Sequence, residues 1–112
     1  MNLRFSEQEL RFRVSKSELE LLCAGNDIEQ CTYLSNDKSL KYLIKNDTNY
    51  KDMFLSYDND YMILYVNNEY IRAFYESLPS RDGLEITQTI DQNKSINLVL
   101  EVDIRTQKRK RG

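Results

Sequence analysis

The order of apolar and polar residues is the same in the two halves of the chain, and this duplication most constrains the fold. Strand-like alternation, a helical segment and further alternation fill residues 1–45, and the same order fills residues 53–104. A shift of 52 residues superimposes the apolar positions of the first part of each half, and after an insertion of four residues near Pro79 a shift of 56 aligns the rest. We therefore expect two β-β-α-β-β units related by a pseudo-two-fold axis.

Local signals within each unit support this interpretation. Alternation with a period of two at residues 10–14 predicts a strand with one buried face. Ser15 followed by Glu18 is a capping-box pattern that begins a helix, and Asn67 is a second helix cap at the equivalent place. Gly25 fits the residue after a helix C-cap. The expected fold class is α+β, with two short helices and mostly antiparallel strands in two four-stranded layers or one curved eight-stranded sheet.

The longest clean alternation in the chain runs from Ile96 to Ile104 and predicts the last strand. The chain of 112 residues has room for one core only. We therefore predict a single domain over residues 1–104, with halves 1–45 and 53–104.

Charge is unevenly distributed along the sequence. Lys and Arg number 16 against 18 Asp and Glu, but five of the bases lie in the last eight residues. An acidic body repels a phosphate backbone, so nucleic-acid binding by residues 1–104 is disfavoured. Residues 105–112 are expected to form a basic flexible tail. Weak nucleic-acid binding, if any, is assigned to its charge run, which consists of Lys108, Arg109, Lys110 and Arg111.

The chemistry that enzymes and metal sites need is mostly absent from the sequence. There is no His, the commonest general base and metal ligand. Cys23 and Cys31 are eight residues apart, which fits no metal or redox motif. The segment from Asp58 to Asp60 begins like a calcium loop, but Ile63 stands where the loop needs Gly. We expect no metal, no cofactor and no catalytic residue, and an enzymatic role is disfavoured though left open.

The sequence contains no targeting or membrane segment that we can identify. The first ten residues lack the apolar centre of a secretion signal. The longest apolar run, residues 61–66, is far shorter than the roughly 20 residues that cross a bilayer. A cytoplasmic location is the resulting expectation.

The strands of the first half carry basic side chains on the face opposite the apolar one. Arg4, Arg11 and Arg13 alternate with the apolar residues of the first hairpin. Such a face is either solvated and neutralises nearby acids, or it binds an anion or an acidic partner. Both interpretations stay open.

The equivalent strand of the second half is apolar on both faces. Tyr61, Ile63 and Tyr65 occupy its second face, and the last two correspond to Arg11 and Arg13. A strand of this kind is either central in the domain or covered by a partner. Because Tyr is enriched at protein interfaces, these three residues are the candidate surface for homodimerisation.

The first third of the chain resembles a family of short, uncharacterised bacterial proteins that share a domain of unknown function. The similarity runs from residue 1 to Gly25 and continues in IEQCTYL, where Thr32-Tyr33-Leu34 departs from a Thr-x-Phe ending. The residues that carry it are Arg11, Arg13, Ser15, Glu18 and Gly25. The resemblance implies a small α+β bacterial domain and assigns no activity.

These observations favour a non-enzymatic domain that acts by binding a protein partner or by forming a homodimer. One alternative is a small-ligand-binding protein or enzyme, with a pocket lined by Tyr and Arg between the two halves. The other is weak nucleic-acid binding through the basic tail.

Overall fold

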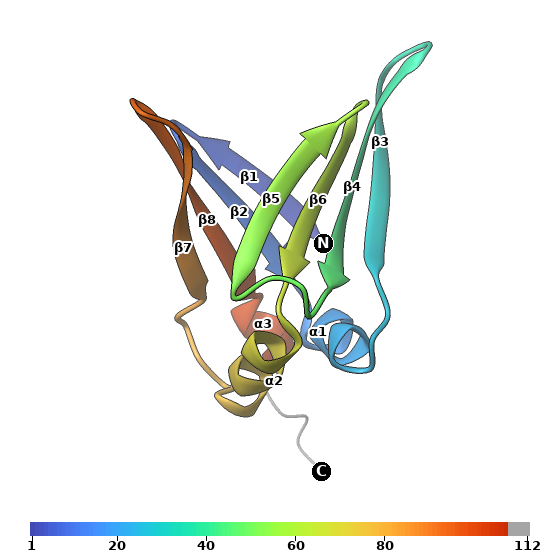
Figure 1. Ribbon diagram of the computed structural model, residues 1–112. Helices are drawn as coiled ribbons and strands as arrows, with labels where there is room; N and C mark the ends of the chain where they lie inside the picture. The colour runs from blue at the N-terminus through green and yellow to red at the C-terminus, as the bar shows by residue number, and fades with distance from the viewer. Residues whose placement is uncertain (108–112) are drawn as a thin grey trace.

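Four β-hairpins and two helices account for most of the chain in the computed structural model, which describes residues 1–107 (Figure 1). The elements follow the predicted order β-β-α-β-β twice, with a short third helix at the end. Their bounds are β1 (Asn2–Ser6), β2 (Glu9–Val14), α1 (Lys16–Cys23), β3 (Ile28–Ser35), β4 (Lys38–Asn46), β5 (Met53–Asp58), β6 (Tyr61–Val66), α2 (Asn68–Glu76), β7 (Leu84–Asp91), β8 (Lys94–Val102) and α3 (Ile104–Gln107).

Each half of the chain contributes one hairpin to each of two four-stranded sheets. Sheet A has the order β1-β2-β8-β7 and sheet B the order β3-β4-β6-β5. The hairpins are antiparallel, but the central pairs, β2 with β8 and β4 with β6, are parallel. The predicted α+β class with mostly antiparallel sheets is confirmed, whereas wholly antiparallel layers are not found. Strands from different halves meet at each centre. In sheet B, β5 lies between β4 and β6 in the sequence and runs opposite to β6, so β4 and β6 run in the same direction.

The strand register confirms two similar β-β-α-β-β halves. Phe12 of β2 lies opposite Leu100 of β8, and Leu64 of β6 lies opposite Ile44 of β4. The shift of 52 residues relates Phe12 to Leu64, and the shift of 56 relates Ile44 to Leu100. Irregularities in the pairing of β3 and β7 also fall at equivalent places. The pseudo-two-fold operation therefore exchanges sheet A with sheet B.

The predicted helix signals have the expected geometry. The Ser15 hydroxyl accepts a hydrogen bond from the Glu18 amide, and the Glu18 carboxylate accepts one from the Ser15 amide, which completes the capping box. The Asn67 side chain accepts hydrogen bonds from two amides in the first turn of α2. Gly25 has a φ of +92°, a conformation that disfavours residues with a Cβ.

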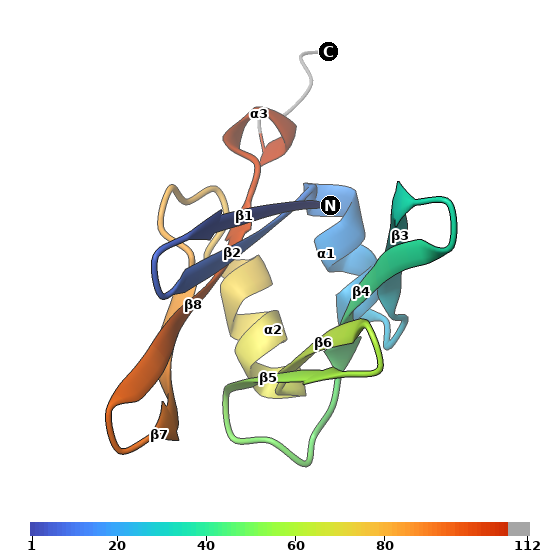
Figure 2. The same ribbon diagram turned by 90° about the horizontal axis from the view of Figure 1, so that it is seen from above.

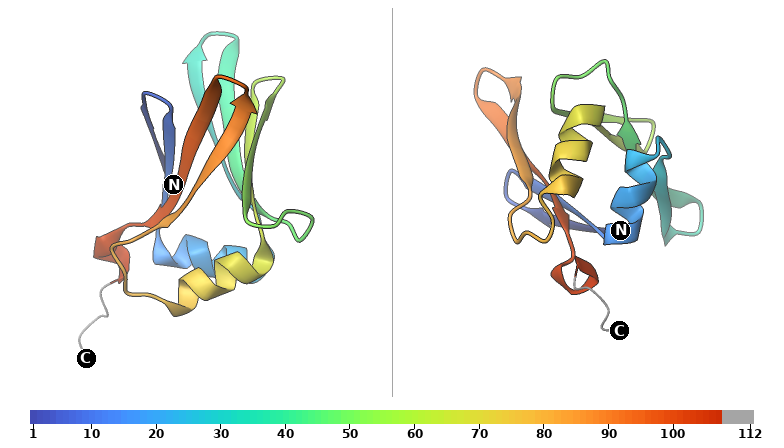
Figure 3. Two further views of the ribbon diagram at one scale, coloured as in Figure 1. Left: turned by 60° about the vertical axis from the view of Figure 1, so that its left-hand side comes forward. Right: turned by 90° about the horizontal axis from the view of Figure 1, so that it is seen from below.

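The core lies between the inner faces of the two sheets, which diverge as the sides of a V. Figures 1 and 3 show α1 and α2 across the narrow end and the hairpin tips of both sheets at the wide end. The buried residues on the inner faces of β2, β6 and β8 are all apolar. Each helix buries two side chains against these faces. The buried helix residues are Leu19, Leu22, Ile71 and Phe74.

The C-terminal segment differs from the prediction. The last strand ends at Val102, because Asp103 accepts the amide of Arg105 on its side chain and the amide of Thr106 on its carbonyl, which begins α3. Ile104 therefore belongs to a helix and not to a strand. Residues 105–107 lie in that helix and not in a flexible tail. Gln107 is buried and bonds to Ser80 and Val102.

The four predicted tail bases Lys108, Arg109, Lys110 and Arg111 lie outside the described residues. Among residues 1–107, no helix has the length and apolar character needed to span a membrane.

Candidate functional site

The residues singled out in the sequence lie on the outer faces of the two sheets. The helices lie at the narrow end of the V, so they leave both outer faces uncovered (Figures 1 and 2). We call the outer side of sheet A, with Arg4, Glu9, Arg11, Arg13 and Glu101, the arginine face. We call the outer side of sheet B, with Tyr50, Phe54, Tyr61, Ile63 and Tyr65, the aromatic face.

Two of the three predicted arginines are bound within the chain. Parallel pairing of β2 with β8 places Arg13 opposite Glu101. Arg13 Nε donates to one oxygen of Glu101 at 2.7 Å, and Arg11 Nη1 donates to the other at 2.7 Å. Arg11 Nε also reaches Glu9 at 3.1 Å. Among the described residues, Arg4 has no carboxylate within ion-pair distance.

The proton affinities of these groups follow from the pairing. Burial by itself would raise the pKa of Glu101, whose side chain is only 14% exposed, but the hydrogen bonds from Arg13 and Arg11 lower it below its ordinary value. The pKa of Arg11 is raised, chiefly by its hydrogen bond to Glu101. A hydrogen bond from Asn97, followed by one from Arg11, lowers the pKa of Glu9. The arginine face is therefore largely charge-balanced at neutral pH.

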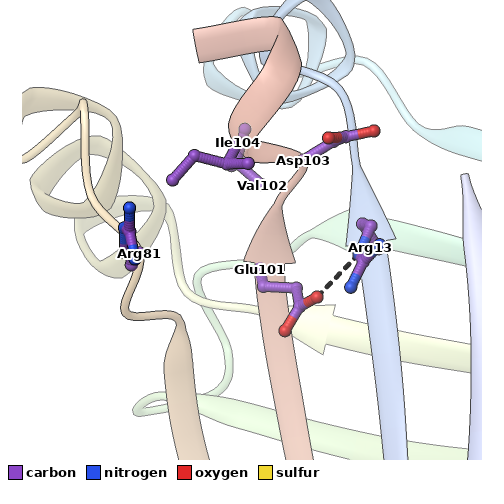
Figure 4. A pocket seen from close by; sticks show the side chains of 6 residues that line it. All are labelled: Arg13, Arg81, Glu101, Val102, Asp103 and Ile104. Carbon is purple, nitrogen blue, oxygen red and sulfur yellow. Dashed lines mark hydrogen bonds and ion pairs between the residues drawn. The ribbon is translucent and has the colours of Figure 1, made fainter.

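Two shallow hollows flank Arg13 and Glu101. The larger has a volume of about 440 Å³ and lies where the two halves of the chain meet. Figure 4 shows Arg81, from the loop between α2 and β7, on the opposite side of this hollow from Arg13. The predicted pocket between the halves thus has arginines in its lining but no tyrosine. The remaining lining residues are Glu101, Val102, Asp103 and Ile104.

The second hollow lies beside β1 and has a volume of about 260 Å³. Three guanidinium groups and one carboxylate contribute to its lining, so it carries net positive charge. Its lining residues are Asn2, Leu3, Arg4, Arg11, Arg13 and Glu101.

The aromatic face has a stacked arrangement, and none of the ion pairs found among residues 1–107 involves it. The Tyr50 ring stacks on Phe54 and on Tyr65, with centroid separations of 5.2 and 4.7 Å. Tyr61, Ile63 and Tyr65 are half-buried. They do not enter the core, because the alternate residues of β6 fill the inner face. β6 is a central strand of sheet B, and its second face is half-buried within the monomer and half open to solvent.

Tyr61 stands at the border of the aromatic face, where polar groups begin. Its hydroxyl donates to Glu29 at 2.7 Å, and this bond raises the pKa of Tyr61. The Lys41 ammonium lies 5.9 Å from the centre of the Tyr61 ring, within cation–π range.

Sequence reasoning missed several residues of both faces. Glu101 and Arg81 are far from the first hairpin in sequence, and Tyr50 and Phe54 lie in and after a polar loop. No signal in the sequence pointed to Glu101, because alternation shows which face of a strand is buried but not which strand lies beside it.

The described residues supply no metal-binding cluster, and both cysteines are free thiols. Cys31 is exposed on β3, and Cys23 is half-buried at the end of α1, where burial raises its pKa.

Comparison with known proteins identified a protein family that matches the chain. No curated protein and no solved structure matched the chain. The sequence model of one protein family, however, matches residues 1–111, which is nearly the whole chain. This agrees with the resemblance noted for the first third and extends it over both halves. The chain belongs to a family of unknown function, DUF7009.

Proposed function

We propose that the protein is a non-enzymatic binding domain that associates with a second copy of itself through the aromatic face. The observation that carries the proposal is the uncovered stack of Tyr50, Phe54 and Tyr65 beside the half-buried Ile63. Apolar groups of this size stay in water only at a free-energy cost of roughly 25 cal/mol per Å². Association removes that cost, and aromatic residues are the usual anchors of such contacts.

The pseudo-symmetry of the chain supplies an internal control for this argument. Ile63 and Tyr65 correspond to Arg11 and Arg13 of sheet A, which face solvent and are satisfied by Glu101. The same backbone position therefore tolerates a charged, internally paired side chain. An aromatic or aliphatic residue at that position is not required by the fold, which supports a role in association.

The border of the aromatic face favours a second copy over an unrelated partner. Lys41 and Lys45 lie along β4, while Glu29 and Asp58 lie on the flanking strands. In a two-fold dimer the same patch meets itself, so that a border of both signs can pair across the interface. Two sheets packed in this way lie about 10 Å apart.

Static light scattering tests the dimer directly. The molar mass should rise from that of one chain, 13.4 kDa, towards twice that value between about 10 µM and about 1 mM protein. Tyr65→Lys should keep the mass of one chain over the whole range, because it leaves a charge within the interface. Arg13→Lys, at the equivalent position of sheet A, is the matched control and should still dimerise. A wild-type protein that stays monomeric contradicts the proposal.

A second candidate function is the binding of a small anion in the larger hollow. It is favoured by Arg81, which has no carboxylate within ion-pair distance among the described residues and lies across the hollow from Arg13. A thermal-shift screen of carboxylates and phosphates tests it, since a ligand of the native state raises the melting temperature. Loss of the shift in Arg81→Ala would support this function, and the absence of any shift would remove it.

Nucleic-acid binding by Lys108, Arg109, Lys110 and Arg111 stays a prediction. Binding to a DNA duplex should disappear when residues 108–112 are deleted and when salt is raised, because it depends on counterion release. Binding that survives both changes contradicts it.

A further inference from the structure

Each sheet has two edge strands, and each edge strand of sheet A lies on the same side of the molecule as one edge strand of sheet B. We call the gap between two such edge strands a seam, and the pseudo-two-fold axis relates the two seams. One seam lies between the edge strands β5 and β7, and the other between the edge strands β1 and β3 (Figure 2). An edge strand has peptide N–H and C=O groups without strand partners, and it can pair with another chain. A side chain bridges the first of these seams but not the second.

The seam between β5 and β7 is closed by one side chain. The Gln88 amide of β7 accepts a hydrogen bond from the Leu55 N–H at 2.7 Å and donates one to the Leu55 C=O at 3.0 Å. A primary amide has the same donor and acceptor as a peptide group, so Gln88 does for β5 what a neighbouring strand would do. The outward peptide groups of Leu55, in the middle of β5, are thereby satisfied.

The seam between β1 and β3 has no such bridge. Thr32 occupies the position equivalent to Gln88, and its hydroxyl bonds instead to the hydroxyl of Tyr42 at 3.1 Å. No hydrogen bond joins β1 to β3 among residues 1–107. Leu3, the counterpart of Leu55, is left without the partner that Leu55 has.

The hairpin geometry shows which groups of β1 are open. Ser6 and Glu9 close a two-residue turn, and such a closing pair exchanges both of its hydrogen bonds. Because hydrogen-bonded pairs alternate along the ladder, Arg4 bonds to β2, while the N–H and C=O of Leu3 and Phe5 point away from it. Two residues of β1 thus present peptide groups at the open edge, as an added strand requires.

The side chains of β1 define what such a strand should carry. Leu3 and Phe5 face inward, and Phe5 is 61% exposed, so an apolar side chain can cover it. Arg4 faces outward without a carboxylate partner among the described residues and lines the positively charged hollow beside β1. An acidic side chain beside Arg4 would meet opposite charge.

We propose that the open edge of β1 docks an extended segment of another protein, with alternating apolar and acidic residues, which adds to sheet A as a fifth strand. The main chain of the segment would bond to Leu3 and Phe5, and its acidic side chains would lie beside Arg4. Strand addition of this kind gains affinity from main-chain bonds and selectivity from alternate side chains. This surface is distinct from the aromatic face, so the proposal does not depend on dimerisation.

The test uses the full chain and two labelled peptides of about eight residues, one alternating Glu with Val and the other alternating Lys with Val. Fluorescence anisotropy should show saturable binding of the glutamate peptide, tighter than that of the lysine peptide by about tenfold or more. Arg4→Glu should reverse this preference. Tyr65→Lys should leave both affinities unchanged, which separates this result from the fate of the dimer.

A backbone variant locates the contact. Leu3→Pro removes the outward N–H, and an edge strand tolerates proline where the N–H faces outward. It should weaken binding by about tenfold more than Leu3→Ala, which loses the side chain but keeps the N–H. Amide hydrogen exchange on the wild-type chain should show new protection at Leu3 and Phe5 when the glutamate peptide is added. The proposal is overturned if neither peptide binds, if Arg4→Glu keeps the original preference, or if protection appears on another edge strand.

Discussion

The outer faces of sheet A and sheet B have the same backbone and opposite chemistry. Equivalent strands lie in equivalent order and register, yet Arg11 and Arg13 on one sheet correspond to Ile63 and Tyr65 on the other. On sheet A the neighbouring strand supplies Glu101, and the charges satisfy one another. On sheet B the equivalent of Glu101 is Lys45, and the face is built from stacked rings.

This difference shows which side chains the fold dictates and which it leaves open. The inner positions are apolar in both sheets, because a shared core must be filled without voids. The outer positions contribute little to that core, so their chemistry can serve another purpose. This contrast is the basis of our proposal that copies associate through the outer face of sheet B, whereas Arg11, Arg13 and Glu101 on sheet A are paired with one another.

The largest expected losses of stability are in the core. They test whether the inner faces of the two sheets contribute equally to it. Phe12→Ala and Leu64→Ala remove equivalent side chains at the centre of each sheet, both with 0% exposure. Each should lower the free energy of unfolding by about 3–5 kcal/mol, because the core cannot collapse around the cavity. Urea denaturation measures both. A cost below about 1 kcal/mol for either variant would mean that the sheets do not share one core.

The next largest loss of stability is expected at Gly83, where the main chain of β8 lies very close. A Cβ placed on Gly83 would lie 2.6 Å from the Leu100 carbonyl oxygen, so Gly83→Ala must displace backbone. It should cost about 1–3 kcal/mol of unfolding free energy. Asp27 is the equivalent residue before β3 and already has a side chain. Asp27→Ala should change stability by less than about 0.5 kcal/mol, and an equal cost for both variants would contradict the difference.

Loss of a single charge should affect stability differently on the two outer faces, and Glu101→Gln tests this on sheet A. Loss of the charged bonds to Arg11 and Arg13 should cost about 1–2 kcal/mol near pH 7, allowing for the partial exposure of both arginines. Lys45→Gln, the matched change on sheet B, should cost less than about 0.5 kcal/mol.

The pH dependence gives the sign of the Glu101 effect. The folded pKa of Glu101 lies below its ordinary value of 4.5, so its contribution to stability is present above that value and is lost as pH falls through the folded pKa. The stability difference between the wild type and Glu101→Gln should therefore shrink on acidification below about pH 4.5. A difference that stays constant from pH 7 to pH 3 would show that the ion pairs are not its source.

The smallest effects concern the two helix caps. Ser15→Ala leaves one amide of the first helical turn without its side-chain acceptor, and Asn67→Ala leaves two. Each should lower the melting temperature by an amount that corresponds to about 1 kcal/mol. Similar costs are expected, since both caps act at the same place in the repeat. A cost at only one cap would show that the two helix starts are not equivalent.

The sequence predicted the local structure well because its signals are local. The repeated order of apolar and polar residues predicted two β-β-α-β-β units, the capping box predicted the start of α1, and Asn67 predicted the start of α2. The matching shifts of 52 and 56 residues identified the repeat. The end of β8 was predicted wrongly at Ile104, because alternation continues there by chance while Asp103 caps the next helix.

The arrangement of the hairpins could not be predicted in the same way. Periodicity shows which face of a strand is buried but not which strand lies beside it, so the exchange of hairpins between the halves was invisible. The partners of the arginines depend on that exchange, since Arg13 and Glu101 are 88 residues apart. The bridge from Gln88 to Leu55 likewise depends on β5 and β7 lying side by side, which the sequence does not show.

A double variant gives sheet B the outer side chains of sheet A and addresses the dimer most directly. Sedimentation equilibrium at about 0.5 mM protein should give the wild type a mass that approaches twice 13.4 kDa. The Ile63→Arg, Tyr65→Arg chain, still folded by circular dichroism, should sediment at 13.4 kDa. A wild type that sediments as one chain, or a double variant that still sediments as two, would show that the aromatic face is not where the copies meet.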